Sequence, residues 1–200
     1  AAADPRVAEQ AKSYFKPFEK VAVLGVGTPK VREIEREIYR AVKPGWTVTD
    51  AVRFCDTLIR SKHLEAKGVG VLLLSRYIGQ LDRNLFDTIR RWLADGYCDN
   101  WASTDSLSTA VLAPLLRRHP ELLEKLSGWT TSTDLWVRRA AAVALTPLAR
   151  KGEHLDAAYR VADRLMTGPE DLIHKAIGWL LRECGKTDDR RLEVFLLERG

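Results

Sequence analysis

The sequence predicts an all-α protein, built as an α-solenoid of HEAT-like helical repeats in a single domain over residues 1–200. Apolar residues recur every three or four positions through most of the chain, which is the period of an amphipathic helix. Segments that alternate apolar and polar residues between hairpin turns do not occur. Similar stretches also recur at a spacing of 36 residues. A length of 200 residues with 46% hydrophobic residues suits one such domain.

The start and end of each helix are marked in the sequence. Thr28-Pro29 gives a capping residue followed by proline, which favours a helix that begins there and carries Ile34, Ile38 and Val42. Glycine occurs at most joins between the later helices. In chain order, we expect those amphipathic helices near residues 48–60, 64–73, 85–94, 121–129, 136–145, 155–166 and 172–181.

Three of these helices are copies of one pattern, in which a basic residue precedes a small one and an apolar run follows. The copies are Leu64–Leu73, Trp136–Leu145 and Leu172–Leu181. Another amphipathic helix precedes each copy, and two helices per unit of about this length are typical of HEAT or armadillo repeats. An irregular helical bundle is the alternative, and the shared register of the three copies argues against it.

The copy expected near residue 100 has a different sequence, Asn100-Trp-Ala-Ser-Thr-Asp105. Trp101 and Asp105 are four residues apart and share one face of a helix. A carboxylate beside an aromatic ring suggests a chemical role in this unit. The alternative is that Ser103 or Asp105 only caps the helix.

The basic residues of the copies predict a positively charged groove. The net charge of +5 permits a polyanionic partner without requiring one. The second helices of a solenoid usually line its concave face, so equivalent cations there would form a stripe that binds phosphate. Taken singly, each of these cations is better interpreted as an ordinary solvated side chain on a helix face. The stripe would consist of Lys67, Arg139 and Lys175, joined by Arg138, Arg182 and Lys186.

Other classes of site find little support in the sequence. Three cysteines without a CxxC pair exclude a disulfide framework and favour a reducing compartment. The four histidines lack metal-ligand spacing, so we expect no metal and no cofactor. Gly25-Val-Gly27 follows no nucleotide-binding strand, and we interpret it as a turn into the helix at Thr28.

The apolar runs are too short to cross a bilayer, and the first ten residues lack the apolar core of a signal peptide. We therefore expect a cytoplasmic protein without a membrane partner. We also expect it to be a monomer.

Several stretches together resemble the DNA alkylation repair family of HEAT-like-repeat DNA glycosylases. The resemblance runs from about Pro17 to Phe195, and the order of the motifs makes it specific. The stretches are Leu24-Gly-Val-Gly-Thr-Pro-Lys-Val-Arg32, Asn100-Trp-Ala-Ser-Thr-Asp105, Trp136-Val-Arg-Arg-Ala-Ala141 and Lys175-Ala-Ile-Gly-Trp-Leu-Leu-Arg-Glu183.

The resemblance implies hydrolysis of the N-glycosidic bond of cationic alkylated purines, chiefly 7-methylguanine and 3-methyladenine, in duplex DNA. It implies that Asp105 is the catalytic carboxylate and that Arg139 contacts phosphate. Trp101 and Trp179 would pack on the sugar and backbone of the lesion.

The chain departs from the family at one aromatic position. The family places a tyrosine near the amino terminus where this sequence has Lys16, and Tyr14 and Phe15 lie beside it. Which of these aromatic side chains completes the site stays open at this point.

The implied chemistry is reasonable for a single carboxylate. Loss of the base leaves an oxocarbenium-like sugar, which a fixed carboxylate stabilises while it orients the attacking water. A cationic purine leaves as a neutral base without a general acid, and no lysine is placed for a Schiff base. The expected protein is a monofunctional glycosylase that starts base excision repair at the nucleoid. The alternative is a non-catalytic scaffold of the same family that binds DNA or protein.

Overall fold

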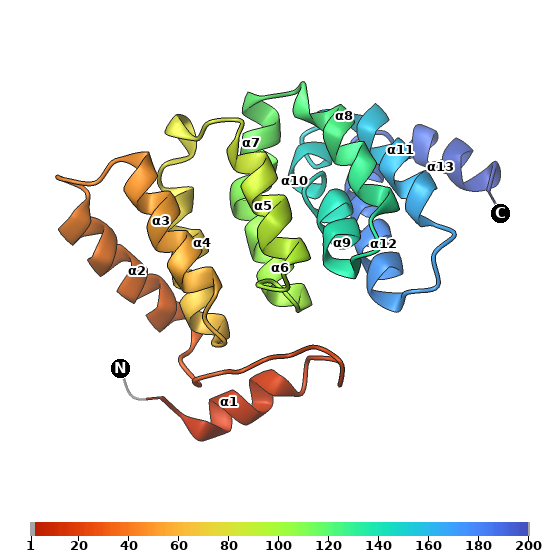
Figure 1. Cartoon of the computed structure of the whole chain (residues 1–200). Coiled ribbons are helices and arrows are strands. Elements are labelled where there is room, and N and C mark those ends of the chain that lie inside the picture. Colours follow the sequence, from red (N-terminus) through yellow and green to blue (C-terminus); the bar gives the residue numbers. More distant parts are fainter. Residues whose placement is uncertain (1–2, 200) are drawn as a thin grey trace.

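The computed structural model describes residues 3–199, and its regular structure there is helical apart from one isolated bridge between Ala22 and His63. The predicted all-α class is confirmed. Figure 1 shows a curved row of helices from α2 to α13, with α1 lying crosswise below them. In chain order the α-helices are α1 (Pro5–Lys12), α2 (Thr28–Val42), α3 (Val48–Ile59), α4 (Leu64–Ser75), α5 (Leu85–Ala94), α6 (Trp101–Leu107), α7 (Ala113–Arg118), α8 (Leu122–Ser127), α9 (Leu135–Val143), α10 (Thr146–Ala149), α11 (Leu155–Leu165), α12 (Asp171–Gly185) and α13 (Asp189–Leu197).

The predicted repeats correspond to pairs of helices. The three similar stretches form α4, α9 and α12, and each follows its own first helix, α3, α8 or α11. The fourth pair is α5 with α6, where the sequence departs from the pattern. Within the row, α3 packs on α4, α11 packs on α12, and α9 packs on both α6 and α12.

Hydrogen bonds between neighbouring units join side chains that are one repeat apart. The Trp92 indole N–H donates to Asp56, with a distance of 2.7 Å between Nε1 and Oδ1. Arg117 donates to Glu153 over 2.6 Å, and both pairs are 36 residues apart in sequence. The sequence period of 36 residues is therefore the spacing between stacked units.

A continuous apolar core runs through the stack. Ala140, Ala141 and Ala142 on α9 are fully buried, and their small side chains allow neighbouring helices to approach closely. The three cysteines are free and buried, as expected for core residues. Within residues 3–199 no helix is long and apolar enough to cross a membrane.

The segment between α1 and α2, residues 13–27, is called the arm below. Backbone N–H groups of residues 24–26 donate to the Glu65 carboxylate at 2.9–3.2 Å and hold this end of the arm on α4. Gly25 has a φ of 84°, and a Cβ there would lie 2.1 Å from the Asp4 carbonyl oxygen. Residues 23–27 have no regular structure, and the backbone of the Gly25-Val-Gly27 motif leads into α2 and binds a carboxylate.

Candidate active site

Helix α6 is built differently from the other second helices. The Asn100 side chain caps it by accepting the Ser103 N–H at 2.9 Å, so the interpretation that Ser103 or Asp105 only caps the helix is wrong. The Thr109 hydroxyl donates to the Asp105 carbonyl oxygen at 2.7 Å, and a π-helical turn begins at Ser108. Such turns are frequent at functional sites.

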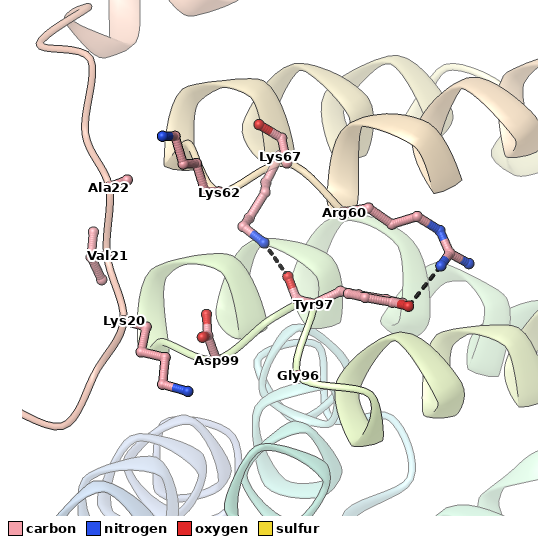
Figure 2. A pocket seen from close by; sticks show the side chains of 10 residues that line it. Lys20, Val21, Ala22, Arg60, Lys62, Lys67, Gly96, Tyr97 and Asp99 are labelled. Atoms are coloured by element: carbon pink, nitrogen blue, oxygen red, sulfur yellow. Dashed lines mark hydrogen bonds between the residues drawn. The ribbon is translucent and has the colours of Figure 1, made fainter.

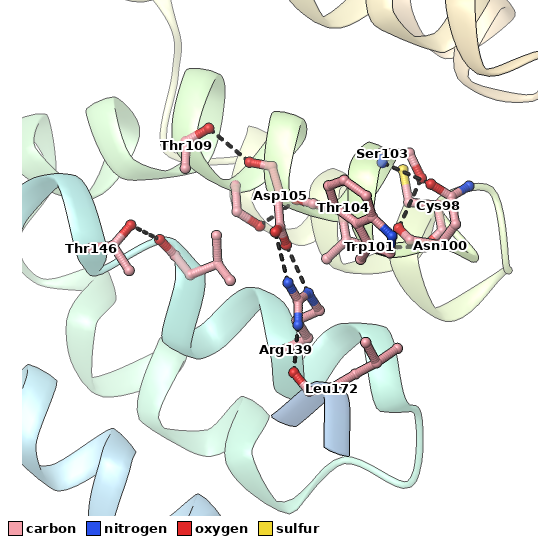
Figure 3. A network of polar contacts seen from close by, with 12 residues as sticks. Cys98, Asn100, Trp101, Ser103, Thr104, Asp105, Thr109, Arg139, Thr146 and Leu172 are labelled. Atoms are coloured by element: carbon pink, nitrogen blue, oxygen red, sulfur yellow. Dashed lines mark hydrogen bonds and ion pairs between the residues drawn. The ribbon is translucent and has the colours of Figure 1, made fainter. Parts of the chain in front are cut away.

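The Asp105 carboxylate faces α9 and binds Arg139 with both oxygens. Arg139 Nε lies 2.8 Å from Oδ1, and Nη2 lies 2.7 Å from Oδ2. Arg139 also donates to the Leu172 carbonyl oxygen at the start of α12 (Figure 3). One guanidinium thus joins α6, α9 and α12 around the carboxylate, and a bidentate pair of this kind fixes its orientation.

The environment of Asp105 changes its acidity. Its side chain is 16% exposed and that of Arg139 is 7% exposed. Burial raises the pKa of the Asp105 carboxyl above its ordinary value; hydrogen bonds and charge from Arg139 lower it, and the charge of Glu19 raises it further. The burial effect is the largest, so Asp105 is a weaker acid than an exposed aspartate.

Trp101 lies at the first position of α6 and contacts the arm. Its ring stacks on Phe15, with 5.3 Å between ring centroids and 23° between planes. Its indole N–H donates to the Tyr14 carbonyl oxygen at 3.3 Å, whereas the Tyr14 ring itself is exposed. Lys16 extends along the arm to Asp171 on α12, 3.0 Å away. Phe15 is therefore the arm aromatic that packs on Trp101.

The expected basic stripe is wrong at three of its six positions. Lys67 is buried, and its ammonium donates to the carbonyl oxygens of Ile59 and Tyr97. Arg138 binds oxygen atoms in the two loops that precede α9 and α12, and Arg139 is held by Asp105. The charged groups of these side chains are bound by oxygen atoms of their own or a neighbouring repeat, so they do not form a row of free cations. Their regular spacing reflects the contacts between units.

The remaining cations lie with Trp179 on one face of α12. Lys175, Trp179, Arg182 and Lys186 follow each other at spacings of four, three and four residues, which places them along one side of the helix. The three cations are more than half exposed and Trp179 is partly buried. Glu183 pairs with Lys186 at 2.9 Å, so part of the positive charge is balanced there.

Two cavities flank the α6 region without including Asp105. One, of about 430 Å³, lies between the arm and the ends of α3 and α5, and is rich in basic side chains (Figure 2). The other, of about 330 Å³, is mainly apolar and lies between α1, α2, α4 and the opposite side of α6. Cations that line the first cavity are Lys20, Arg60, Lys62 and Lys67.

The side chains at the site offer one oriented carboxylate, one guanidinium and stacked aromatic rings. In the part of the chain that the structure describes, no three His, Cys, Asp or Glu side chains come together to hold a metal ion. A carboxylate with little access to water interacts strongly with nearby charge, because the local dielectric constant is low. Asp105 is thus placed to stabilise a positive charge that approaches its exposed edge.

Two features of the site were missed by the sequence analysis. Glu19 accepts the Trp101 backbone N–H at 2.8 Å, and the arm has no helical period that could have indicated this contact. The pairing of Asp105 with Arg139 spans 34 residues, close to one repeat, so the repeat spacing could have suggested it.

The fold and the site define the class of the protein: an α-solenoid of HEAT-like repeats that carries a partly buried carboxylate, an arginine and a tryptophan where one repeat is modified. Over residues 1–200 the chain matches the model of a protein family described as DNA alkylation repair enzyme. The chain belongs to this family. No curated protein matches it in sequence.

Solved structures share the fold. A predicted DNA alkylation repair enzyme from Enterococcus faecalis superposes with a TM-score of 0.81 at 17% identity, over 98% of this chain and 89% of that one. AlkD2 from Streptococcus mutans superposes with a TM-score of 0.64 at 17% identity, over 100% of this chain and 90% of that one. At this identity the likeness concerns the fold alone.

Proposed function

We propose that this protein is a monofunctional DNA glycosylase that hydrolyses the N-glycosidic bond of cationic alkylated purines in duplex DNA. The observation that carries the proposal is the Asp105 carboxylate, oriented by Arg139 beside Trp101 in the modified repeat. Membership of the DNA alkylation repair family supports this reading of the site.

The proposed chemistry needs one negative charge at the reacting sugar. As the bond to the base breaks, positive charge develops on the sugar, and the fixed Asp105 carboxylate stabilises it. Arg139 keeps the carboxylate from rotating away, because it binds both oxygens. Asp105 also orients the water that attacks the sugar carbon. An alkylated purine already carries positive charge and leaves as a neutral base, so a second group that donates a proton is unnecessary.

The proposed DNA interface continues along α12. Lys175, Arg182 and Lys186 contact backbone phosphates, and Trp179 packs against the sugars between them. Trp101 packs on the sugar of the damaged nucleotide, next to Asp105. The protein acts as a monomer in this proposal, and a duplex carrying the alkylated base is its partner.

The direct test uses duplex DNA with a single 7-methylguanine, 3-methyladenine, hypoxanthine, uracil or 8-oxoguanine. We expect release of the two cationic bases and negligible release of the three neutral ones, since no acid is present to protonate a neutral leaving base. Free base is measured by chromatography, and strand cleavage is measured on a gel. The abasic product should remain intact until alkali or heat is added.

Two outcomes would contradict the proposal. Efficient release of hypoxanthine would require a proton donor or an enclosed base pocket at the site. Tight binding of duplex DNA without release of any base would make the protein a non-catalytic DNA-binding member of the family.

A further inference from the structure

Glu19 on the arm is a second carboxylate of the Asp105 site. It is 7% exposed, and both of its oxygens accept backbone N–H groups. Oε1 lies 2.8 Å from the Trp101 nitrogen, and Oε2 lies 2.7 Å from the Lys16 nitrogen. Asp105 follows Trp101 by one turn of α6, so Glu19 holds the turn that carries both Trp101 and Asp105.

The charges near Asp105 do not balance once Glu19 is included. Asp105 and Arg139 form a bidentate pair whose charges cancel. Glu19 accepts only backbone N–H groups, and the ion pairs formed within residues 3–199 do not include it. The buried centre of the site therefore carries a net negative charge.

Charged groups on the neighbouring elements do not neutralise this negative charge by an ion pair. On α4, which packs on α6, Lys67 binds the carbonyl oxygens of Ile59 and Tyr97, and Glu65 accepts backbone N–H groups of the arm. Helix α6 has no charged side chain other than Asp105. On the arm and α12, Lys16 and Lys175 both pair with Asp171, and this cluster is about half exposed, so solvent screens it. On α9, Arg138 pairs with a glutamate in the loop before α12.

We propose that Glu19 is a positioning residue, which fixes the first turn of α6 and supplies the net negative charge that favours a cationic base and a cationic sugar at Asp105. The inference rests on the proposed glycosylase function and names the origin of its selectivity for cationic lesions. In the ground state Glu19 disfavours ionisation of Asp105; when positive charge develops beside them, both carboxylates stabilise it.

The test compares Glu19→Gln with Glu65→Gln. Glutamine keeps an oxygen that accepts the Trp101 N–H and removes the charge, and its NH2 group cannot accept the Lys16 N–H. Glu65→Gln loses an accepting oxygen in the same way, so the two variants are matched in this respect. Glu65 is the matched control, because its carboxylate also holds the arm through backbone N–H groups, and it is not among the groups that shift the pKa of Asp105. Melting temperatures of both variants are measured first, to check that they fold.

Single-turnover release of 7-methylguanine is measured from pH 3.5 to pH 9 for the wild type and both variants, and spontaneous release without protein is subtracted. For Glu19→Gln we expect a maximal rate about tenfold lower, unweakened binding of duplex DNA, and an acid limb that moves to lower pH. The acid limb moves down because Asp105 ionises more easily once the neighbouring negative charge is gone. For Glu65→Gln we expect a rate within about twofold and an unmoved acid limb.

Equal rate losses in the two variants with unmoved acid limbs would overturn the inference, because Glu19 would then only fasten the arm. Absence of base release from the wild type would contradict the proposed function instead. In that case the inference is decided by the carboxyl carbon-13 titration of Asp105: its pKa should fall in Glu19→Gln and stay in Glu65→Gln. A pKa that does not change in Glu19→Gln overturns the inference.

Discussion

Asp105 on α6 and Glu183 on α12 are both carboxylates that an arginine contacts, and their acidities differ in direction. Hydrogen bonds from Arg150 and Lys186 lower the pKa of Glu183 to about 2. Burial raises the pKa of Asp105 despite two hydrogen bonds from Arg139.

The difference comes from the partners of each acid. The Glu183 side chain is only 1% exposed, but two cations bind it, Arg150 at 59% and Lys186 at 56% exposed, and their hydrogen bonds outweigh the effect of its burial. Asp105 has one cation, which is buried with it, and a second carboxylate nearby. Two cations lower the pKa of Glu183 although it is buried, whereas the single cation Arg139 does not offset the burial of Asp105, and a shift of this second kind is frequent at functional sites.

The largest expected effect concerns catalysis. Asp105→Asn should lower the rate of 7-methylguanine release at least about 100-fold, because the amide keeps the shape of the side chain but loses its charge. Glu183→Gln, the matched change in the other acid, should leave the rate within about threefold at saturating DNA. The rates are measured in single turnover. Similar rate losses in both variants would remove the distinction between the two acids.

The next expected effect concerns stability. Arg139→Ala leaves a buried carboxylate without its cation and should lower the free energy of unfolding by about 3 kcal/mol. Arg150→Ala removes one of two cations from the buried Glu183 carboxylate, which keeps Lys186, and should cost less than Arg139→Ala does. Urea unfolding at pH 7 gives both values. A larger loss in Arg150→Ala than in Arg139→Ala would contradict the account.

Much of the fold could be predicted from the sequence, because a repeat constrains both helices and their stacking. The 36-residue spacing of Trp136 and Leu172 gave the repeat unit, and the unusual stretch at Trp101–Asp105 gave the place where the stack is modified. The chemical type of the modified site followed from the same stretch, since an aromatic ring and a carboxylate are rare in a small-residue helix.

The directions of the long side chains could not be predicted in the same way. Lys67 and Arg139 occupy equivalent positions, but carbonyl oxygens at the ends of neighbouring helices bind the first and a carboxylate binds the second. Tyr97 and Asp105 belong to the neighbouring unit in each case, and partners from another unit leave no mark in local periodicity. The contacts of Phe15 and Glu19 on the arm were missed for a related reason, because the arm is irregular and its contacts are some 80 residues away.

The most direct test is a titration of both acids in one sample. Burial should make Asp105 a weaker acid than usual, and two cations should make Glu183 a stronger one. Carboxyl carbon-13 shifts of Asp105 and Glu183 are followed from pH 2 to pH 7 in the folded wild-type protein. We predict that Asp105 protonates first as the pH falls, with a pKa above its ordinary value, and that Glu183 stays ionised to about pH 2. An Asp105 pKa at or below the ordinary value would contradict it.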